Sequence, residues 1–192
     1  YQTAGASLLL AALVMCVYML GRKQGAGPVV RAWIRNFQTS AWFRRHFFLA
    51  FYVGMMLFRT ILCRSIWGNP LDHVLGIWGL YNDGNLYTEN FENLVLFLPF
   101  MVLLLWAGEE KEHFKEKSIQ DVLILSFKIS FLFSLGIEFS QLFFKLGTFQ
   151  LTDLFFNTVG GLLGGIWYWG FDRVRRKIEG AIRRFGGWDV TP

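Results

Sequence analysis

Two pairs of polar residues stand at helical spacing inside segments that are otherwise apolar. The first pair is Glu138 and Gln141, and the second is Asp153 and Asn157. A charged side chain in hydrocarbon costs at least ~2.5–3.5 kcal/mol, so such groups are paired, solvated in a cavity or directed at a ligand. Two carboxyl groups in unequal environments can also act as a general acid and a general base. Glu138 and Asp153 are therefore candidate catalytic residues.

The apolar segments around these pairs have the length of membrane spans. The chain has 192 residues and is 54% hydrophobic, and its charged residues fall mainly between the apolar runs. A bilayer requires about 20 apolar residues per helix, and an open chain satisfies its backbone there only as a helix. The sequence therefore predicts an all-α fold, a polytopic membrane helix bundle. We expect about five spans, at roughly 4–21, 43–63, 92–107, 119–144 and 152–171.

Lysine and arginine gather on one side of the expected spans. They fall between the first two spans, between the third and fourth, and after the fifth: Arg22, Lys23, Arg31, Arg35, Arg44, Arg45, Lys111, Lys115, Lys117, Arg173, Arg175, Arg176, Lys177, Arg183 and Arg184. The positive-inside rule then predicts an external N-terminus and a cytoplasmic C-terminus. The net charge of +5 is explained by this topology, so nucleic acid is not an expected partner.

We expect one membrane domain in three parts. Residues 1–45 hold the first span and a basic cytoplasmic linker, residues 46–171 a four-span core, and residues 172–192 a basic tail. The linker segment 29–37 and the tail each place apolar side chains on one helical face and basic ones nearer the other. This pattern predicts amphipathic helices on the anionic cytoplasmic leaflet, either as plain anchors or as recruiting surfaces.

Helix geometry predicts that the polar pairs meet. The polar face of span 119–144 covers a sector of about 120° and comprises Ser126, Ser130, Ser134, Glu138 and Gln141. Span 152–171 carries two small-xxx-small pairs, Gly160 with Gly164 and Gly161 with Gly165, which let a neighbouring helix approach closely. Packing the serine face near the glycine face would bring Glu138, Gln141, Asp153 and Asn157 together at the external end.

Four further polar residues are expected at the same depth. Glu92 and Asn93 begin the third span, whereas Arg59 and Arg64 lie at the external end of the second. A contact of Arg59 with Glu138 or Asp153 would neutralise both charges. The alternative is that all these polar groups serve helix packing alone.

Metal and disulfide chemistry find little support in the sequence. The three histidines are scattered over both sides of the expected membrane, and Cys16 and Cys63 stand at different depths. We expect no metal site, no disulfide and no cofactor.

Three motifs in the second half occur in a fixed order. They are Asn93-Leu-Val-Leu-Phe-Leu-Pro99-Phe100, Glu138-x-x-Gln141, and Asp153-x-x-x-Asn157-x-x-Gly160-Gly161-x-x-Gly164, preceded by Arg64 at the end of a span. In these residues the chain resembles the VanZ-like family, named for a teicoplanin-resistance protein of Gram-positive bacteria. The resemblance covers about residues 57–170. Two departures are Met101, where the family commonly has glycine, and the lack of an arginine after Gly147, for which Lys145 is a possible substitute.

The resemblance implies a cell-envelope protein of a bacterial plasma membrane, which in the named member of the family lowers susceptibility to a lipoglycopeptide. Our leading hypothesis is a protein that binds or modifies an anionic lipid or lipid-linked glycan, such as a lipid-linked cell-wall precursor or a teichoic-acid-type glycolipid. Arg59 and Arg64 would bind phosphate, with the carboxyl and carboxamide groups orienting the rest. A lipid transferase or hydrolase that uses Glu138 and Asp153 is the second hypothesis. A small lipid flippase or transporter, working as a homodimer, is the third.

Overall fold

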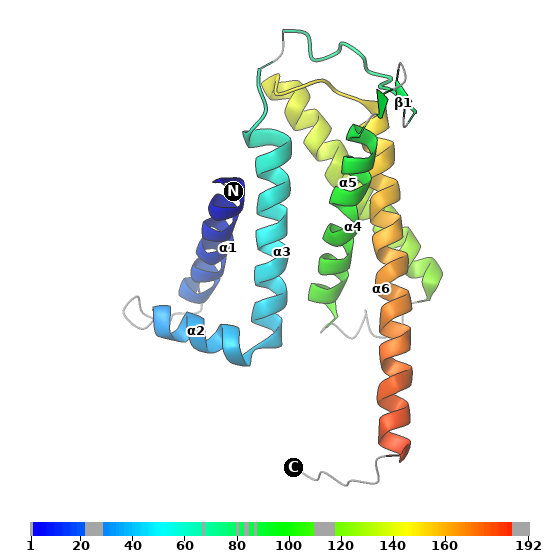
Figure 1. The fold of residues 1–192 in the computed structure, drawn as a ribbon. Coiled ribbons are helices and arrows are strands. Elements are labelled where there is room, and N and C mark those ends of the chain that lie inside the picture. Colours follow the sequence, from blue (N-terminus) through cyan, green and yellow to red (C-terminus); the bar gives the residue numbers. More distant parts are fainter. Residues whose placement is uncertain are drawn as a thin grey trace.

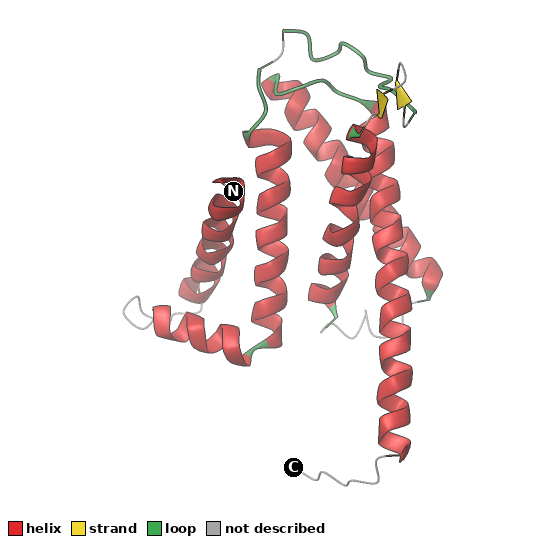
Figure 2. Cartoon of the chain, viewed as in Figure 1, coloured by secondary structure: helices red, strands yellow, loops and turns green. Residues whose placement is uncertain are grey.

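Figure 1 shows the computed structural model of the chain, which describes residues 2–21, 29–66, 68–79, 81–82, 85–86, 88–109 and 118–185. Its helices are α1 (Gln2–Gly21), α2 (Val29–Thr39), α3 (Ala41–Leu57) continued by the π-helical η1 (Phe58–Leu62), α4 (Glu89–Gly108), α5 (Ile119–Phe144) and α6 (Leu151–Phe185). Two short antiparallel strands, β1 (Tyr81–Asn82) and β2 (Asn85–Leu86), lie in the connection to α4 (Figure 2). The fold class is all-α, as the sequence predicts.

The bundle has two ends of different character. The described residues between 63 and 88, together with segment 145–150, cross one end of the bundle, which we call the loop end (Figure 1). We call the opposite end the tail end. There, α2 lies across the bundle, and α6 continues beyond the remaining helices (Figure 1). Consequently, α6 is the one labelled helix that runs from the loop end to well past the tail end.

Three helices of the described chain are long and apolar enough to cross a membrane. They are Ala41–Leu62, Glu89–Gly108 and Ile119–Phe144, which correspond to the second, third and fourth expected spans. The first expected span contains a shorter apolar helix, Ala4–Met19, and α6 is not in this group. The polar and glycine residues in the first half of α6 lower its hydropathy.

The expected basic helices have different surroundings. α2 is a separate helix whose Trp33 and Phe37 pack against the cluster formed by α1 and α3. The tail, in contrast, is no separate helix, because α6 continues without a break to Phe185. Its apolar side chains Phe171, Val174, Ile178 and Ile182 are exposed. Several residues used in the sequence argument lie outside the described part of the chain: Arg22, Lys23, Lys111, Lys115, Lys117 and residues 186–192.

Local hydrogen bonds fix where the central helices begin and end. Ser40 caps α3 by accepting a hydrogen bond from the Phe43 N–H at 3.2 Å. Ser118 and Asp121 form a reciprocal capping box at the start of α5. Lys145 ends α5 in the left-handed region with φ 55°, which turns the chain toward α6. The turn at Lys145 therefore places the end of α5 and the start of α6 next to each other at the loop end.

Glycines let α6 contact two helices at backbone distance. A Cβ atom at Gly160 or Gly164 would overlap a main-chain carbonyl oxygen of α4, at Leu94 or Leu98. A Cβ atom at Gly161 would overlap the Ser130 hydroxyl of α5, and one at Gly165 would overlap that of Ser126. The two glycine pairs therefore serve different partners, and α6 lies in the angle between α4 and α5.

The Gly160→Ala substitution should destabilise the bundle, because the new methyl group must displace the α4 backbone. We expect a loss of about 1–3 kcal/mol in the free energy of unfolding. Gly170→Ala is the matched control, since nothing lies within 4 Å of a Cβ atom there. Thermal unfolding of both variants in detergent measures the difference, and equal midpoints would contradict this packing.

Candidate functional site

The polar residues singled out from the sequence gather at the loop end, where helical segments begin or end. The set comprises Arg59 and Arg64 in and after η1, Glu92 and Asn93 near the start of α4, Glu138 and Gln141 near the end of α5, and Asp153 and Asn157 near the start of α6. Their meeting point is therefore made by elements distant in sequence.

Glu138 and Gln141 bind main-chain groups from other segments. Glu138 is 1% exposed, and its Oε2 accepts a hydrogen bond from the Gln150 N–H at 2.9 Å. Gln141 is likewise buried, and its Nε2 donates to the Thr60 carbonyl oxygen of η1 at 2.7 Å. Glu138 thus fixes the entry into α6, whereas Gln141 links α5 to the π-helical segment.

Several buried polar atoms of the site lack a hydrogen-bond partner. The Asn157 Nδ2 donates to Ser134 Oγ at 2.9 Å, and Asn93 lies next to the Asp153 carboxyl group. The atoms without a partner in the described chain are Asn90 Oδ1, Asn93 Nδ2, Gln141 Oε1, Asp153 Oδ1 and Asn157 Oδ1. Each such atom costs about 1–3 kcal/mol when it stays unsatisfied. Their concentration at one place marks a site with unused capacity to bind water or a ligand.

The two arginines of the loop end have different acidic neighbours. Arg59 forms an ion pair with Glu92, and the contact with Glu138 or Asp153 that the sequence suggested does not form. Arg59 lies on the outer side of η1, and its side chain is 62% exposed. It is Arg64 that acts electrostatically on both Glu138 and Asp153.

Arg64 is held between α4 and the segment after α5. Its Nη2 lies 4.0 Å from Glu89 Oε1. Gly147 has φ 126°, and a Cβ atom there would lie 3.3 Å from Arg64 Nη1. Lys145, the possible substitute for the absent family arginine, is exposed. The guanidinium group at this junction therefore comes from Arg64, whereas the Lys145 side chain is directed to the surface.

A groove of about 490 Å³ opens beside the arginines. It is lined by Met55, Arg59, Cys63, Arg64 and Leu96, from the α3–η1 segment and α4. One part of this wall is apolar, and the other presents two guanidinium groups. Such a surface suits an amphiphile whose polar group carries phosphate or another anion.

The segment 68–79 is fastened over the buried side of the site. Asn90 Nδ2 donates to the carbonyl oxygens of Ile77 and Gly79, at 2.7 and 3.1 Å. The N–H groups of Phe149 and Leu151 donate to main-chain oxygens of the same segment. Gly76, at φ 65°, leaves no room for a side chain against Thr152. Hence the buried carboxyls are closed off from this side, whereas the groove stays open.

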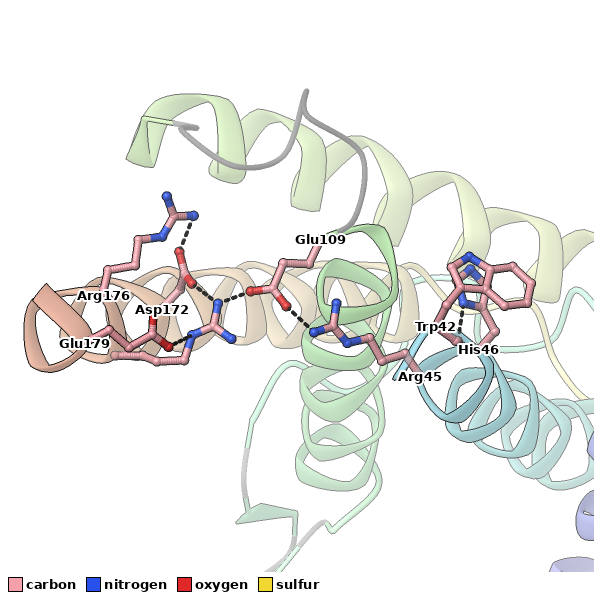
Figure 3. A network of polar contacts seen from close by, with 8 residues as sticks. Trp42, Arg45, His46, Glu109, Asp172, Arg176 and Glu179 are labelled. Carbon is pink, nitrogen blue, oxygen red and sulfur yellow. Dashed lines mark hydrogen bonds and ion pairs between the residues drawn. The ribbon is translucent and has the colours of Figure 1, made fainter. Parts of the chain in front are cut away.

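A second polar cluster, which the sequence argument missed, lies at the tail end (Figure 3). The Glu109 carboxylate bridges Arg45 of α3, at 2.9 Å, and Arg175 of α6. Asp172 pairs with Arg175 and Arg176, each at 2.7 Å. The basic residues here were interpreted only as a topology signal; Glu109 at the end of an apolar run was the cue to an ion network.

Metal ligands do not cluster in the described residues, where no group of three His, Cys, Asp or Glu side chains could hold an ion. Both cysteines are free, and Cys63 is exposed in the groove. What the loop end offers chemically is therefore two guanidinium groups, several carboxyls and carboxamides, and an apolar wall.

Comparison with known proteins gives two matches. The VanZ/LLP1 family model matches residues 7–172. Protein VanZ of Enterococcus faecium is 33% identical over 78 residues, which are 41% of this chain and 42% of that protein. The match thus covers less than half of the length of that relative. No solved structure matches the chain.

Two substitutions of Glu138 distinguish the contribution of its hydrogen bond to stability from the contribution of its charge. Glu138→Gln keeps an oxygen that can accept from the Gln150 N–H, whereas Glu138→Ala leaves that buried donor unsatisfied. We expect Glu138→Ala to lower the free energy of unfolding by about 1–3 kcal/mol and Glu138→Gln to cost clearly less. Thermal unfolding of the purified proteins tests this. Equal losses in the two variants would show that the hydrogen bond to Gln150 is not what stabilises the site.

Proposed function

Because the chain belongs to the VanZ/LLP1 family, we propose that it is an envelope membrane protein that binds the anionic group of a lipid or lipid-linked glycan. The observation that carries the proposal is the groove, where Arg59 and Arg64 stand beside an apolar wall of Met55 and Leu96. A phosphate group would contact the guanidinium groups, and an attached hydrocarbon chain would follow the apolar wall.

The proposal includes the full membrane topology. α1 and the first part of α6 join the three long apolar helices to give five spans, with the loop end outside. The basic residues of α2 and of the α6 tail then lie on the cytoplasmic side, in keeping with the positive-inside rule. In this orientation, the groove opens at the level of the outer leaflet.

Binding of such a lipid in the groove would lower susceptibility to glycopeptides by acting on their target. A bound lipid-linked precursor or glycolipid would be masked or altered at the surface on which teicoplanin acts. The reaction alternative, with Glu138 and Asp153 as base and acid, requires the bundle to open around them, because these carboxyls are 1% and 5% exposed. The groove requires no such opening, so binding is the function that the geometry favours.

Expression of the chain in a Gram-positive host should raise the teicoplanin concentration needed to inhibit growth. We expect Arg64→Gln to abolish the increase, since it removes a groove cation. Lys145→Gln, which removes an exposed charge at the same end but outside the groove lining, should keep it. The comparison is made at equal membrane abundance. Retained resistance in Arg64→Gln would exclude the groove from the mechanism.

The orientation has a direct chemical test at Cys63. In a Cys16→Ser variant, Cys63 is the single thiol of the chain, and it is exposed. A membrane-impermeant maleimide should label it in intact cells as fully as in lysed cells. Labelling that requires lysis would place the loop end inside and contradict the proposed topology.

A further inference from the structure

Both arginines of the groove already have acidic partners on the first turn of α4. Arg59 forms an ion pair with Glu92, and Arg64 lies 4.0 Å from Glu89. Glu89 and Glu92 are three residues apart, so they share one face of the helix. The two cations that line the groove are therefore each matched by a carboxylate, and the two pairs together carry no excess of positive charge.

The charge balance of these two ion pairs limits which ligand the groove can take. Each guanidinium group is matched by one carboxylate, at Glu92 for Arg59 and at Glu89 for Arg64. A purely anionic ligand would take the arginines away from Glu89 and Glu92 and leave like charges facing one another. Such an arrangement is unfavourable unless a cation restores the balance.

A ligand with both charges avoids this cost. Its phosphate would replace the two glutamates at Arg59 and Arg64, and its ammonium group would replace the two arginines at Glu89 and Glu92. The four side chains are accessible for this exchange, since they are 62% (Arg59), 49% (Glu92), 32% (Arg64) and 34% (Glu89) exposed.

From this charge arrangement we propose that the groove selects a zwitterionic amphiphile, one with a phosphate and a primary ammonium group, over a purely anionic one. The inference rests on the proposed function, because it identifies the class of ligand for the same groove. Met55 and Leu96 bind the hydrocarbon chain, Arg59 and Arg64 the phosphate, and Glu89 and Glu92 the ammonium group.

Protection of Cys63 from alkylation reports occupancy of the groove. The full chain with Cys16→Ser is purified in a maltoside detergent, and the rate of Cys63 modification by a neutral maleimide is measured. Phosphatidylethanolamine and phosphatidylglycerol are the two probes, titrated as mole fractions of the micelle. We expect half-protection at an ethanolamine-lipid fraction about two- to fivefold lower than the glycerol-lipid fraction, as for one to two exposed ion pairs.

Glutamate variants identify the cause of the preference. Glu89→Gln with Glu92→Gln should abolish or reverse the preference while protection by phosphatidylglycerol persists. Asp72→Asn, which removes an exposed carboxylate of the loop end away from the groove lining, should leave it unchanged. Thermal unfolding of each variant confirms that it is folded.

The outcomes separate this inference from the function on which it rests. If phosphatidylglycerol protects Cys63 as well as phosphatidylethanolamine does, or if the double glutamine variant keeps the preference, the zwitterionic selectivity is wrong and lipid binding stands. If neither lipid slows the alkylation, both the selectivity and the proposed binding function are overturned.

Discussion

Close approach of α6 to both α4 and α5 is the constraint on which the rest of the structure depends. Gly160 and Gly164 admit the α4 backbone, and Gly161 and Gly165 admit the serine hydroxyls of α5. At larger separations, Asn157 could not reach Ser134, and Asp153 would not lie next to Asn93. Small residues in the middle of the helices thus decide which polar groups meet at their ends.

The same helix links the two polar clusters of the molecule. At the loop end, α6 contributes Asp153 and Asn157; at the tail end, it contributes Asp172 and Arg175 to the network around Glu109. Glu109 also holds Arg45, so α3, α4 and α6 are joined electrostatically there. The walls of the groove come from α3–η1 and α4, and their separation is therefore set both by core packing and by an ion network at the opposite end.

Periodicity and length predicted the helical fold and the three long apolar helices, because these depend on local patterns. The polar faces of α5 and α6 likewise indicated which side chains would be buried at the loop end. The partners of individual side chains were harder to predict: the sequence suggested a contact of Arg59 with Glu138 or Asp153, whereas Arg59 pairs with Glu92. The sequence indicated the depth of Arg59 but not the direction of its side chain, which lies in the π-helical η1, where the rotation per residue differs from that of an α-helix. The network of Glu109 was missed because its partners are distant in sequence.

The most direct test of the groove as a lipid site is to identify what remains bound after purification. Native mass spectrometry of the wild-type chain and of Arg64→Gln, extracted from the same membranes in the same detergent, makes the comparison. Our account predicts phosphate-containing lipid adducts on the wild-type protein that are strongly depleted in the variant, at equal thermal stability. Identical adducts on both proteins, or none on either, would contradict it.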